Sequence, residues 1–443
     1  MAFASMSGPR AAPKPMQIAA AVVGNALEWY DFIVFGFLTV VIARLFFPAE
    51  SQYGSLLLTT ATFGVGFFMR PVGGILLGIY ADRSGRKAAL LLIIVLMTAA
   101  IAMIGFAPTY AAVGVAAPLL IVAARLLQGF ATGGEFAAAT SFLIESAPAH
   151  RRGFYGSWQM VGQGLAALIG ALLGALVTRN LAPDALNSWG WRVPFLVGLV
   201  IGPVGLFIRR HLEETEAFLD VRRAAALERG LGATLAAQLK GGLACMGLIT
   251  AGTISFYVIL LYMPTFARLQ LHVPLDQAFI AQSISIVFMI VLIPLFGALS
   301  DRVGRKPILI ASLALYLVLA YPLFDWLHKN PSFANLTMVQ VVFCCLLGAM
   351  FGPVSTAVAE QFAARARSTA LGIAYNLAVM IFGGFAQFFV TWLIAATGSP
   401  IAPCFYVIFG AAVGLTAAFF LVEHAGDARL PTLETVAQPS EAA

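Results

Sequence analysis

The sequence predicts an all-α membrane protein with twelve transmembrane helices in two pseudo-symmetric six-helix bundles. Three observations lead to this prediction. First, 60% of the 443 residues are hydrophobic and only 10% are charged, whereas soluble domains carry about 25% charged residues. Second, the apolar residues form repeated runs of about 20, a length that crosses a bilayer as a helix. Third, a charged stretch in the first half recurs at the matching position of the second half.

The apolar runs give the helices in order along the chain. β-Strands do not fit, because the runs are continuous rather than alternating in polarity. Most joints are short, so neighbouring helices run antiparallel. The predicted spans are residues 17–47, 54–80, 88–107, 118–145, 153–177, 191–208, 241–267, 277–299, 307–325, 337–362, 369–396 and 401–422. They divide the chain into a cytoplasmic arm (1–16), an N-terminal bundle (17–208), a cytoplasmic central loop (209–240), a C-terminal bundle (241–422) and a cytoplasmic tail (423–443).

The positive charges of the joints predict the orientation. Lys and Arg flank membrane helices mainly on the cytoplasmic side. Most of the Lys and Arg residues in the joints fall on the side that also holds both termini and the central loop. We therefore expect a multi-pass protein of the bacterial inner membrane with both termini in the cytoplasm. This topology also accounts for the net charge of +6 without a nucleic-acid partner.

A ten-residue joint is repeated between the halves. The sequence at 78–87 reads GIYADRSGRK after the second span, and GALSDRVGRK at 297–306 follows the eighth. Paired six-helix repeats place a substrate site near the bilayer midplane between the halves. Charged residues of these joints and of two further helix ends are predicted to latch the halves together: Asp82, Arg83, Arg86, Glu145, Asp301, Arg302, Arg305 and Glu360.

The repeated joint resembles the signature of the major facilitator superfamily. Other stretches are similar to its metabolite–proton symporter branch: GNALEWYDF at 24–32, FMRPVGG at 68–74, RLLQGF at 125–130, WGWRVPF at 189–195 and ETEAFL at 214–219. The resemblance extends from about residue 17 to about residue 422. It implies a single-chain transporter of organic acids such as citrate, tricarballylate, 2-oxoglutarate and shikimate, or of osmolytes such as proline and betaine.

Five ionisable side chains lie deep inside the predicted spans. An ionised group there costs about 3 kcal/mol or more unless it is paired or wetted. Glu28 and Asp31 share one face of the first span, and Arg70 lies on the second. The fourth span carries a polar stripe about 15 Å long that should face a central cavity: Arg125, Gln128, Thr132 and Glu135.

An acid on the first helix opposite an arginine on the fourth could work as a proton switch. The arginine would hold the acid ionised, and protonation of the acid would free the arginine to bind a substrate carboxylate. Asp31 and Arg125 resemble the equivalent pair of the superfamily's proton-coupled sugar porters, although Glu28 or Glu135 could take the proton instead. The alternative is static ion pairing of Arg70 with Glu28 and of Arg125 with Asp31.

The neutral polar groups of the spans are weaker candidates for substrate contact, because each could equally form an ordinary interhelical hydrogen bond. The predicted substrate-binding residues, with the two arginines included, are Asn25, Arg70, Arg125, Gln128, Gln159, Gln163, Tyr257, Tyr375 and Asn376.

The motifs of other function classes are missing from the sequence. It contains no HExxH, GxSxG or GxxxxGK[ST], so we expect neither an enzyme nor an ATP-driven pump. The four cysteines have no metal-ligand spacing. No cofactor is expected, and a proton gradient would supply the driving force. A sensor built on a transporter fold is less favoured, because a sensor has no need of a switchable ion pair.

Two buried arginines favour an anionic substrate, because each offers a bidentate fork to a carboxylate. A zwitterionic osmolyte would instead need an acid for its ammonium group or a cage of aromatic rings, and Glu28 with Trp29 and Tyr30 could supply these. The stretches 46–51 and 210–219 resemble the citrate and tricarballylate members of the branch. We therefore predict import of a di- or tricarboxylate with protons by alternating access, by a monomer in the lipid bilayer. The alternatives are proton-coupled symport of proline or betaine, or of another organic acid such as 2-oxoglutarate or shikimate.

Overall fold

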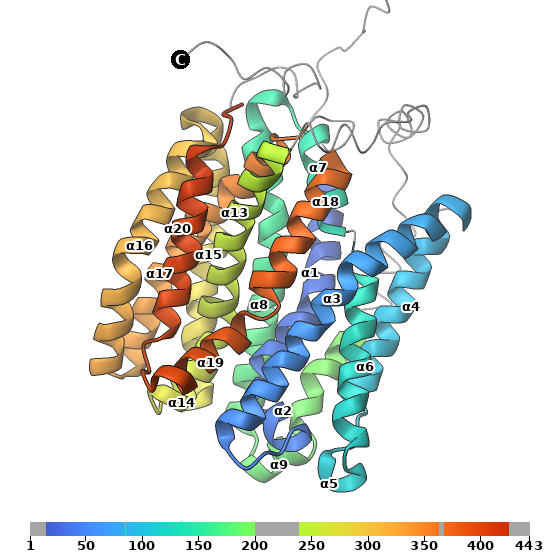
Figure 1. Cartoon of the computed structure of the whole chain (residues 1–443), viewed down its shortest axis with the longest axis vertical. Helices are drawn as coiled ribbons and strands as arrows, with labels where there is room; N and C mark the ends of the chain where they lie inside the picture. The colour runs from blue at the N-terminus through green and yellow to red at the C-terminus, as the bar shows by residue number, and fades with distance from the viewer. Residues whose placement is uncertain (1–14, 85, 134, 200–238, 363–366, 425–443) are drawn as a thin grey trace, which may run out of the picture.

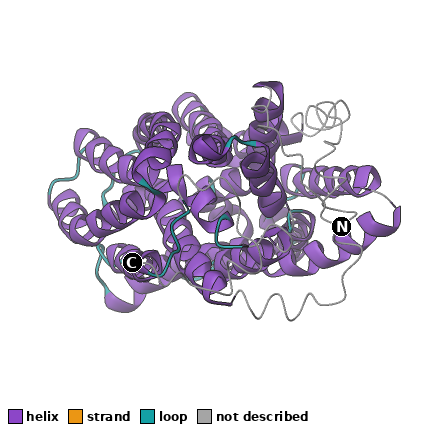
Figure 2. Ribbon diagram, turned by 90° about the horizontal axis from the view of Figure 1, so that it is seen from above, coloured by secondary structure: helices purple, strands orange, loops and turns teal. Residues whose placement is uncertain are grey.

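The structure is a computed structural model, and it describes residues 15–84, 86–133, 135–199, 239–362 and 367–424. All regular elements within these ranges are helices (Figures 1 and 2). Most of the predicted arm, central loop and tail lies outside the described residues. The side chains of four predicted site residues also lie outside the description: Asp82, Arg83, Arg86 and Glu135.

The helices reproduce the predicted order of spans. Seven helical stretches are long and apolar enough to cross a membrane, and a bent pair of helices makes an eighth. Three shorter apolar helices supply further spans, and helical residues 193–199 begin the sixth span, which is described only to residue 199. The predicted all-α membrane fold with twelve spans is therefore confirmed.

The elements have the following bounds. Single helices form most spans: α3 (Gln52–Ser84), α4 (Arg86–Gly105), α8 (Arg152–Asn180), α15 (Leu275–Val303), α16 (Arg305–Lys329), α17 (Phe333–Ala359) and α20 (Pro403–Phe419). The interrupted spans are α1 (Pro15–Phe37) with α2 (Thr39–Phe46), α6 (Ala116–Ala131) with α7 (Glu135–Ser146), α13 (Leu239–Ser255) with the π-helix η3 (Phe256–Tyr262) and α14 (Met263–Gln270), and α18 (Arg367–Ala378) with the π-helix η4 (Val379–Gly383) and α19 (Ala386–Thr397). Short joint helices are α5 (Tyr110–Val113), α9 (Pro183–Ser188), η1 (Ala149–Arg151) and η2 (Gly190–Arg192).

The first span bends by 64° between α1 and α2. At the bend the Thr39 hydroxyl donates to the Gly36 carbonyl at 2.7 Å, a bond within the preceding turn that is known to distort membrane helices. Pro71, Pro294, Pro322 and Pro353 lie inside continuous helices instead. Neighbouring helices and side chains can satisfy the backbone groups that a proline frees in a membrane helix.

The prediction of one continuous helix over 118–145 is wrong. The span divides into α6 and α7, and the break follows Ala131. At this break α3 approaches so closely that a Cβ atom on Gly133 would collide with the backbone at Arg70 and Gly74. The Gly133 carbonyl accepts a hydrogen bond of 2.8 Å from the Asn376 amide instead. The predicted polar stripe is described as far as Thr132, and the side chain of Glu135 lies outside the described residues.

The chain forms two bundles that pack side by side. In the first, α8 packs on α1, and α6 packs on α3 and α4; in the second, α15 packs on α17, and α20 packs on α13 and α16. Figure 1 shows the second bundle in yellow to red beside the blue and cyan helices of the first. The most extensive contact between the bundles joins α8 to α15, and α3 also contacts α19. Residues far apart in sequence can therefore meet at this interface.

The outer faces of the helices are apolar. Ile75 is 64% exposed on α3, Leu295 is 58% exposed on α15 and Val318 is 68% exposed on α16. Extended exposed apolar surface of this kind is foreign to soluble monomers and suits contact with lipid.

The tightest helix packing lies between α3 and α6, behind the candidate site. A Cβ atom on Gly129 would collide with the Gly66 carbonyl, and one on Gly73 would collide with the Phe130 carbonyl. Backbone cannot yield as a flexible side chain can, so these helices can lie this close only if the contact positions have no side chain.

Gly129→Ala should therefore lower the stability of the folded protein by about 1–3 kcal/mol, because α3 and α6 must move apart. Thermal unfolding in detergent measures the effect. Gly242→Ala is the matched control, because a Cβ atom at Gly242 meets nothing within 4 Å. Equal melting temperatures for the two variants would show that the close approach does not support the bundle.

Candidate functional site

Two small cavities lie between the bundles. The larger has a volume of about 40 Å³, and the smaller of about 10 Å³, which is room for roughly three water molecules and one. Trp29, Phe136 and Tyr375 line both cavities. The rings of Phe136 and Tyr375 stack with their centroids 3.7 Å apart. This aromatic pair joins α7 of the first bundle to α18 of the second and lies between the two cavities.

Arg70 lines the smaller cavity and is only 2% exposed. Its Nε donates to the Thr132 hydroxyl at 3.2 Å. Its guanidinium lies 4.7 Å from the ring centre of Phe67, 5.0 Å from that of Phe32 and 5.2 Å from that of Trp29. The cation is thus held mainly by aromatic faces, which can each contribute about 1–2 kcal/mol in a desolvated site.

Arg125 is fully buried and lines neither cavity. Its Nη1 donates to Gln128 at 2.7 Å, and its Nη2 donates to the Phe63 carbonyl at 3.4 Å. The rings of Phe32, Phe35 and Phe63 lie 4.6–4.8 Å from the guanidinium. Its Nε has no hydrogen-bond partner. Phe32 contacts both arginines, so the two cations share one aromatic wall.

The static ion pairs considered as the alternative are not found among the described residues. Neither Arg70 with Glu28 nor Arg125 with Asp31 forms an ion pair within 4.0 Å, and all four side chains belong to the described part of the chain. Glu28 lines the smaller cavity together with Arg70. Asp31 is 3% exposed and lies against the sixth span, where a Cβ atom on Gly198 would come within 2.7 Å of its Oδ1.

The predicted neutral candidates divide into two groups. Gln163, Tyr257, Tyr375 and Asn376 line one or both cavities. Asn25 and Gln159 line neither, because they bond each other and join α1 to α8: Asn25 Nδ2 donates to the Gln159 carbonyl at 2.7 Å, and Gln159 Nε2 donates to Asn25 Oδ1 at 3.2 Å. Gln128 contacts Arg125 and also lines neither cavity. Only the first group is in position to touch a molecule between the bundles.

The aromatic cage considered for an osmolyte is not assembled. Tyr30 lines neither cavity, because its hydroxyl donates to the Pro194 carbonyl at 2.7 Å on the other side of α1. Glu28 and Trp29 do face the smaller cavity.

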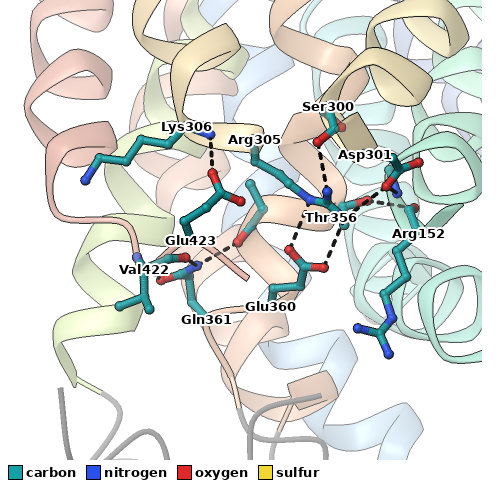
Figure 3. Close-up of polar contacts among 12 residues, drawn as sticks. Arg152, Ser300, Asp301, Arg305, Lys306, Thr356, Glu360, Gln361, Val422 and Glu423 are labelled. Carbon is teal, nitrogen blue, oxygen red and sulfur yellow. Dashed lines mark hydrogen bonds and ion pairs between the residues drawn. The ribbon is translucent and has the colours of Figure 1, made fainter. Parts of the chain in front are cut away.

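Asp301 latches the two bundles at one end (Figure 3). Its carboxylate accepts the backbone N–H groups of Gly153 at 2.7 Å and Phe154 at 2.9 Å, at the start of α8. The first N–H groups of a helix have no partner within the helix, and its N-terminus carries a partial positive charge. A carboxylate from the second bundle thus caps a helix of the first. A Cβ atom on Gly153 would collide with Ser300, so this approach requires glycine.

Arg305 holds the latch carboxylates in place. It lies 3.1 Å from Asp301 and 3.3 Å from Glu360, and it donates to the Ser300 carbonyl at 2.9 Å. Two further contacts cross between the bundles at this end: Arg367 pairs with Glu145 at 2.8 Å, and the Thr356 hydroxyl donates to the Arg152 carbonyl at 3.0 Å. The predicted latch residues Glu145, Asp301, Arg305 and Glu360 are brought together. Arg302 is exposed and makes no such contact among the described residues.

Contacts at the other end of the bundles close the cavities from that side. Gln270 donates to the Tyr53 hydroxyl at 2.9 Å, and Thr39 Oγ1 lies 3.3 Å from Gln387 Oε1. Phe385 of the second bundle packs against Gly64 and Phe68 of α3. The described residues of the two bundles are therefore joined on both sides of the cavities.

Sequence reasoning missed several residues of the site. Thr253 and Ser355 line the larger cavity, and Phe136 separates the two cavities. Arg152, Thr356 and Arg367 contribute to the latch. The sequence provides little indication of Phe136, Thr253, Ser355 and Thr356, because serine, threonine and phenylalanine are common in membrane helices. Which way such side chains point depends on how the bundles pack.

Paired helical bundles that span a membrane, enclose buried arginines between them and latch at one end define a class of protein: a multi-pass membrane transporter. The first half, residues 16–234, matches the family model described as "Sugar (and other) transporter", and residues 243–441 match the model "Major Facilitator Superfamily". The chain belongs to the major facilitator superfamily.

Three similar proteins illustrate this membership. The citrate–proton symporter of Salmonella typhi is 38% identical over 90% of this chain and 92% of its own length. The proline/betaine transporter of Escherichia coli K12 is 33% identical over 92% of this chain and 83% of its own length. Among solved structures, a D-xylose–proton symporter is similar with a TM-score of 0.72 at 20% identity, over 94% of this chain and 99% of that one. These relatives are transporters, in agreement with the prediction that the chain is not an enzyme.

Asp301→Asn should speed amide hydrogen exchange at the start of α8, because the neutral amide is a weaker acceptor for Gly153 and Phe154. A hydrogen bond to a charged group contributes about 1.5–3 kcal/mol, so we expect exchange there to be at least about tenfold faster. Mass spectrometry of peptides covering residues 150–158 measures it. Asp325→Asn is the matched control, since Asp325 pairs only with the exposed Lys329. Unchanged protection in Asp301→Asn would rule out the carboxylate cap.

Proposed function

We propose that the chain imports a di- or tricarboxylate, such as citrate, together with protons by alternating access between the bundles 17–208 and 241–422. It would act as a monomer in a bacterial inner membrane, with both termini in the cytoplasm. The observation that carries the substrate class is the pair of buried arginines, neither of which has an ion-pair partner among the described residues.

The charge of Arg70 supports an anionic substrate. A guanidinium buried without a carboxylate partner is unfavourable by several kcal/mol, and aromatic faces offset only part of this cost. A substrate carboxylate entering the smaller cavity would meet Arg70 from an open side and could form two parallel hydrogen bonds. Arg125 lies behind Phe32, on the shared aromatic wall. A modest movement of that wall would let the second cation face the same anion.

Glu28 and Asp31 would carry the protons, with Glu135 as a further candidate. When Glu28 and Asp31 are ionised, they balance the two arginine charges within the first bundle. When they are protonated, the cavity keeps two uncompensated cations and attracts an anion. This alternation would couple the proton to the substrate, because the buried site is nearly neutral either with ionised acids or with bound anion and protonated acids.

The residue placement supports a carboxylate over an osmolyte. Tyr30 lines neither cavity, so its ring face does not contribute to a quaternary ammonium cage there. The citrate–proton symporters of Salmonella typhi and Klebsiella pneumoniae are also more similar to this chain, at 38% identity, than the proline/betaine transporter of Escherichia coli K12, at 33%.

The test is uptake of radiolabelled citrate by proteoliposomes that hold the purified protein, with and without an inward proton gradient. Gradient-dependent accumulation that tricarballylate inhibits and betaine does not would support the proposal. Proton-dependent uptake of betaine or proline without citrate uptake would reject the carboxylate and leave a proton-coupled osmolyte symporter.

Arg70→Gln should lower citrate uptake at low substrate concentration by at least about 30-fold. Truncating one partner of a buried charged pair typically costs 2–5 kcal/mol, and glutamine keeps much of the side-chain volume while it removes the charge. Arg268→Gln, at an exposed position of α14, is the matched control. Near-normal uptake by Arg70→Gln, at equal amounts of protein in the vesicles, would exclude Arg70 as the anion's anchor.

A further inference from the structure

The larger cavity has a mostly apolar wall that includes a few neutral polar residues. Its polar lining residues are Gln163, Thr253, Tyr257, Ser355 and Tyr375, and the other described lining residues are apolar or aromatic. None of these described residues carries a formal charge at neutral pH. Arg70, Arg125, Glu28 and Asp31 are not among the residues that line this cavity. The two cavities therefore differ in kind: the smaller one holds charges, and the larger one holds hydroxyl and amide groups.

Ser355 is the informative member of this wall. It is fully buried on α17, and its Oγ has no hydrogen-bond partner. Serine in a membrane helix usually bonds a carbonyl of its own preceding turn. Ser285, equally buried on α15, does so by donating to the Ala281 carbonyl at 2.7 Å. Ser355 lacks this bond and lines the cavity instead. A buried hydroxyl without a partner is unfavourable by about 1–3 kcal/mol, which indicates that a bound ligand forms the missing hydrogen bond.

Tyr257 presents a second hydroxyl of the same kind. It lies on the π-helix η3, is 1% exposed, and its OH has no hydrogen-bond partner. Edge-on contacts with Phe63, Phe67 and Phe256 fix its ring, with centroids 5.5–5.9 Å apart. π-Helical segments in longer helices are frequent at functional sites. Two orphan hydroxyls from different spans of the second bundle thus line one cavity.

We infer that Ser355 and Tyr257 form a neutral subsite that binds an uncharged hydrogen-bonding group of the transported acid. This inference rests on the proposed function, in which the arginines take the ionised carboxylates. The group in the neutral subsite is a hydroxyl or a protonated carboxyl, because an ionised carboxylate there would lose its hydration without gaining a cation. The subsite selects hydroxy acids or partly protonated tricarboxylates over plain dicarboxylates.

The experiment compares competitors of labelled citrate uptake in matched pairs. Malate differs from succinate by one hydroxyl, and tricarballylate differs from glutarate by one carboxyl. For the wild-type protein we expect the acid with the additional hydroxyl or carboxyl to inhibit about fivefold more strongly in at least one pair. A fivefold difference corresponds to the net free energy of about one hydrogen bond. The malate pair reports a hydroxyl in the subsite, and the tricarballylate pair reports a protonated carboxyl.

Ser355→Ala should reduce that preference to less than twofold, and Ser285→Ala should leave it unchanged. Misfolding is not expected from Ser355→Ala, because the change removes a hydroxyl that has no partner; its melting temperature should match that of the wild type. Tyr257→Phe should reduce the same preference independently.

Three results would overturn the inference. A wild-type protein without preference in either pair would do so, and so would preferences that survive both Ser355→Ala and Tyr257→Phe. A wild-type protein that takes up no citrate under a proton gradient would overturn the proposed function itself, and the subsite with it. The first two results leave citrate uptake intact, so the two failures are distinguishable.

Discussion

Arg70 and Arg125 place two positive charges in the first bundle, at 2% and 0% exposure, with no carboxylate within 4.0 Å among the described residues. A cation in this setting needs compensation, and the structure supplies it with the faces of aromatic rings. The ring of Phe32 serves both cations. The compensation is partial, and under the proposed function the remaining charge would attract the transported anion.

The close packing of the first bundle keeps these charges away from water. Glycine contacts bring α3 and α6 together behind Arg70 and Arg125, and the close approach continues to the break between α6 and α7. On the open side, the stacked rings of Phe136 and Tyr375 span the two bundles between the cavities. When the bundles separate, this stacked pair must part, because its members belong to different bundles. Access to the charged cavity is therefore tied to the movement of the bundles.

The latch and the site lie in different parts of the interface and are stabilised by different kinds of interaction. Asp301 caps the N-terminus of α8, a contact that a small rotation of the bundles would break completely. The contacts described at the opposite end are formed by aromatic and amide side chains rather than by charged ones, such as Phe385 with Phe68 and Gln270 with Tyr53. The latched end thus has the stronger electrostatic restraint, which favours opening at the other end first.

The sequence predicted what depends on local pattern. Span order followed from apolar runs, and the repeated joint led to Asp301 and Arg305 in the latch. The sequence could not predict features that arise where helices cross. The break at Gly133 lies where α6 meets α3, and an ideal helical projection of the span does not include such a break. Asn25 and Gln159 were predicted to contact substrate, but they bond each other. Ser355 and Ser285 cannot be told apart from the sequence, because only the structure shows which hydroxyl lacks a hydrogen bond.

The central claim is that the buried arginine charge is balanced either by Glu28 and Asp31 in their ionised form or by the transported anion. Calorimetric titration of citrate into the purified protein, repeated in buffers of different ionisation enthalpy, measures the protons exchanged on binding. The account predicts a net uptake of protons by the wild-type protein that falls in a Glu28→Gln, Asp31→Asn double variant while citrate still binds. Citrate binding to the wild-type protein without proton uptake would contradict it.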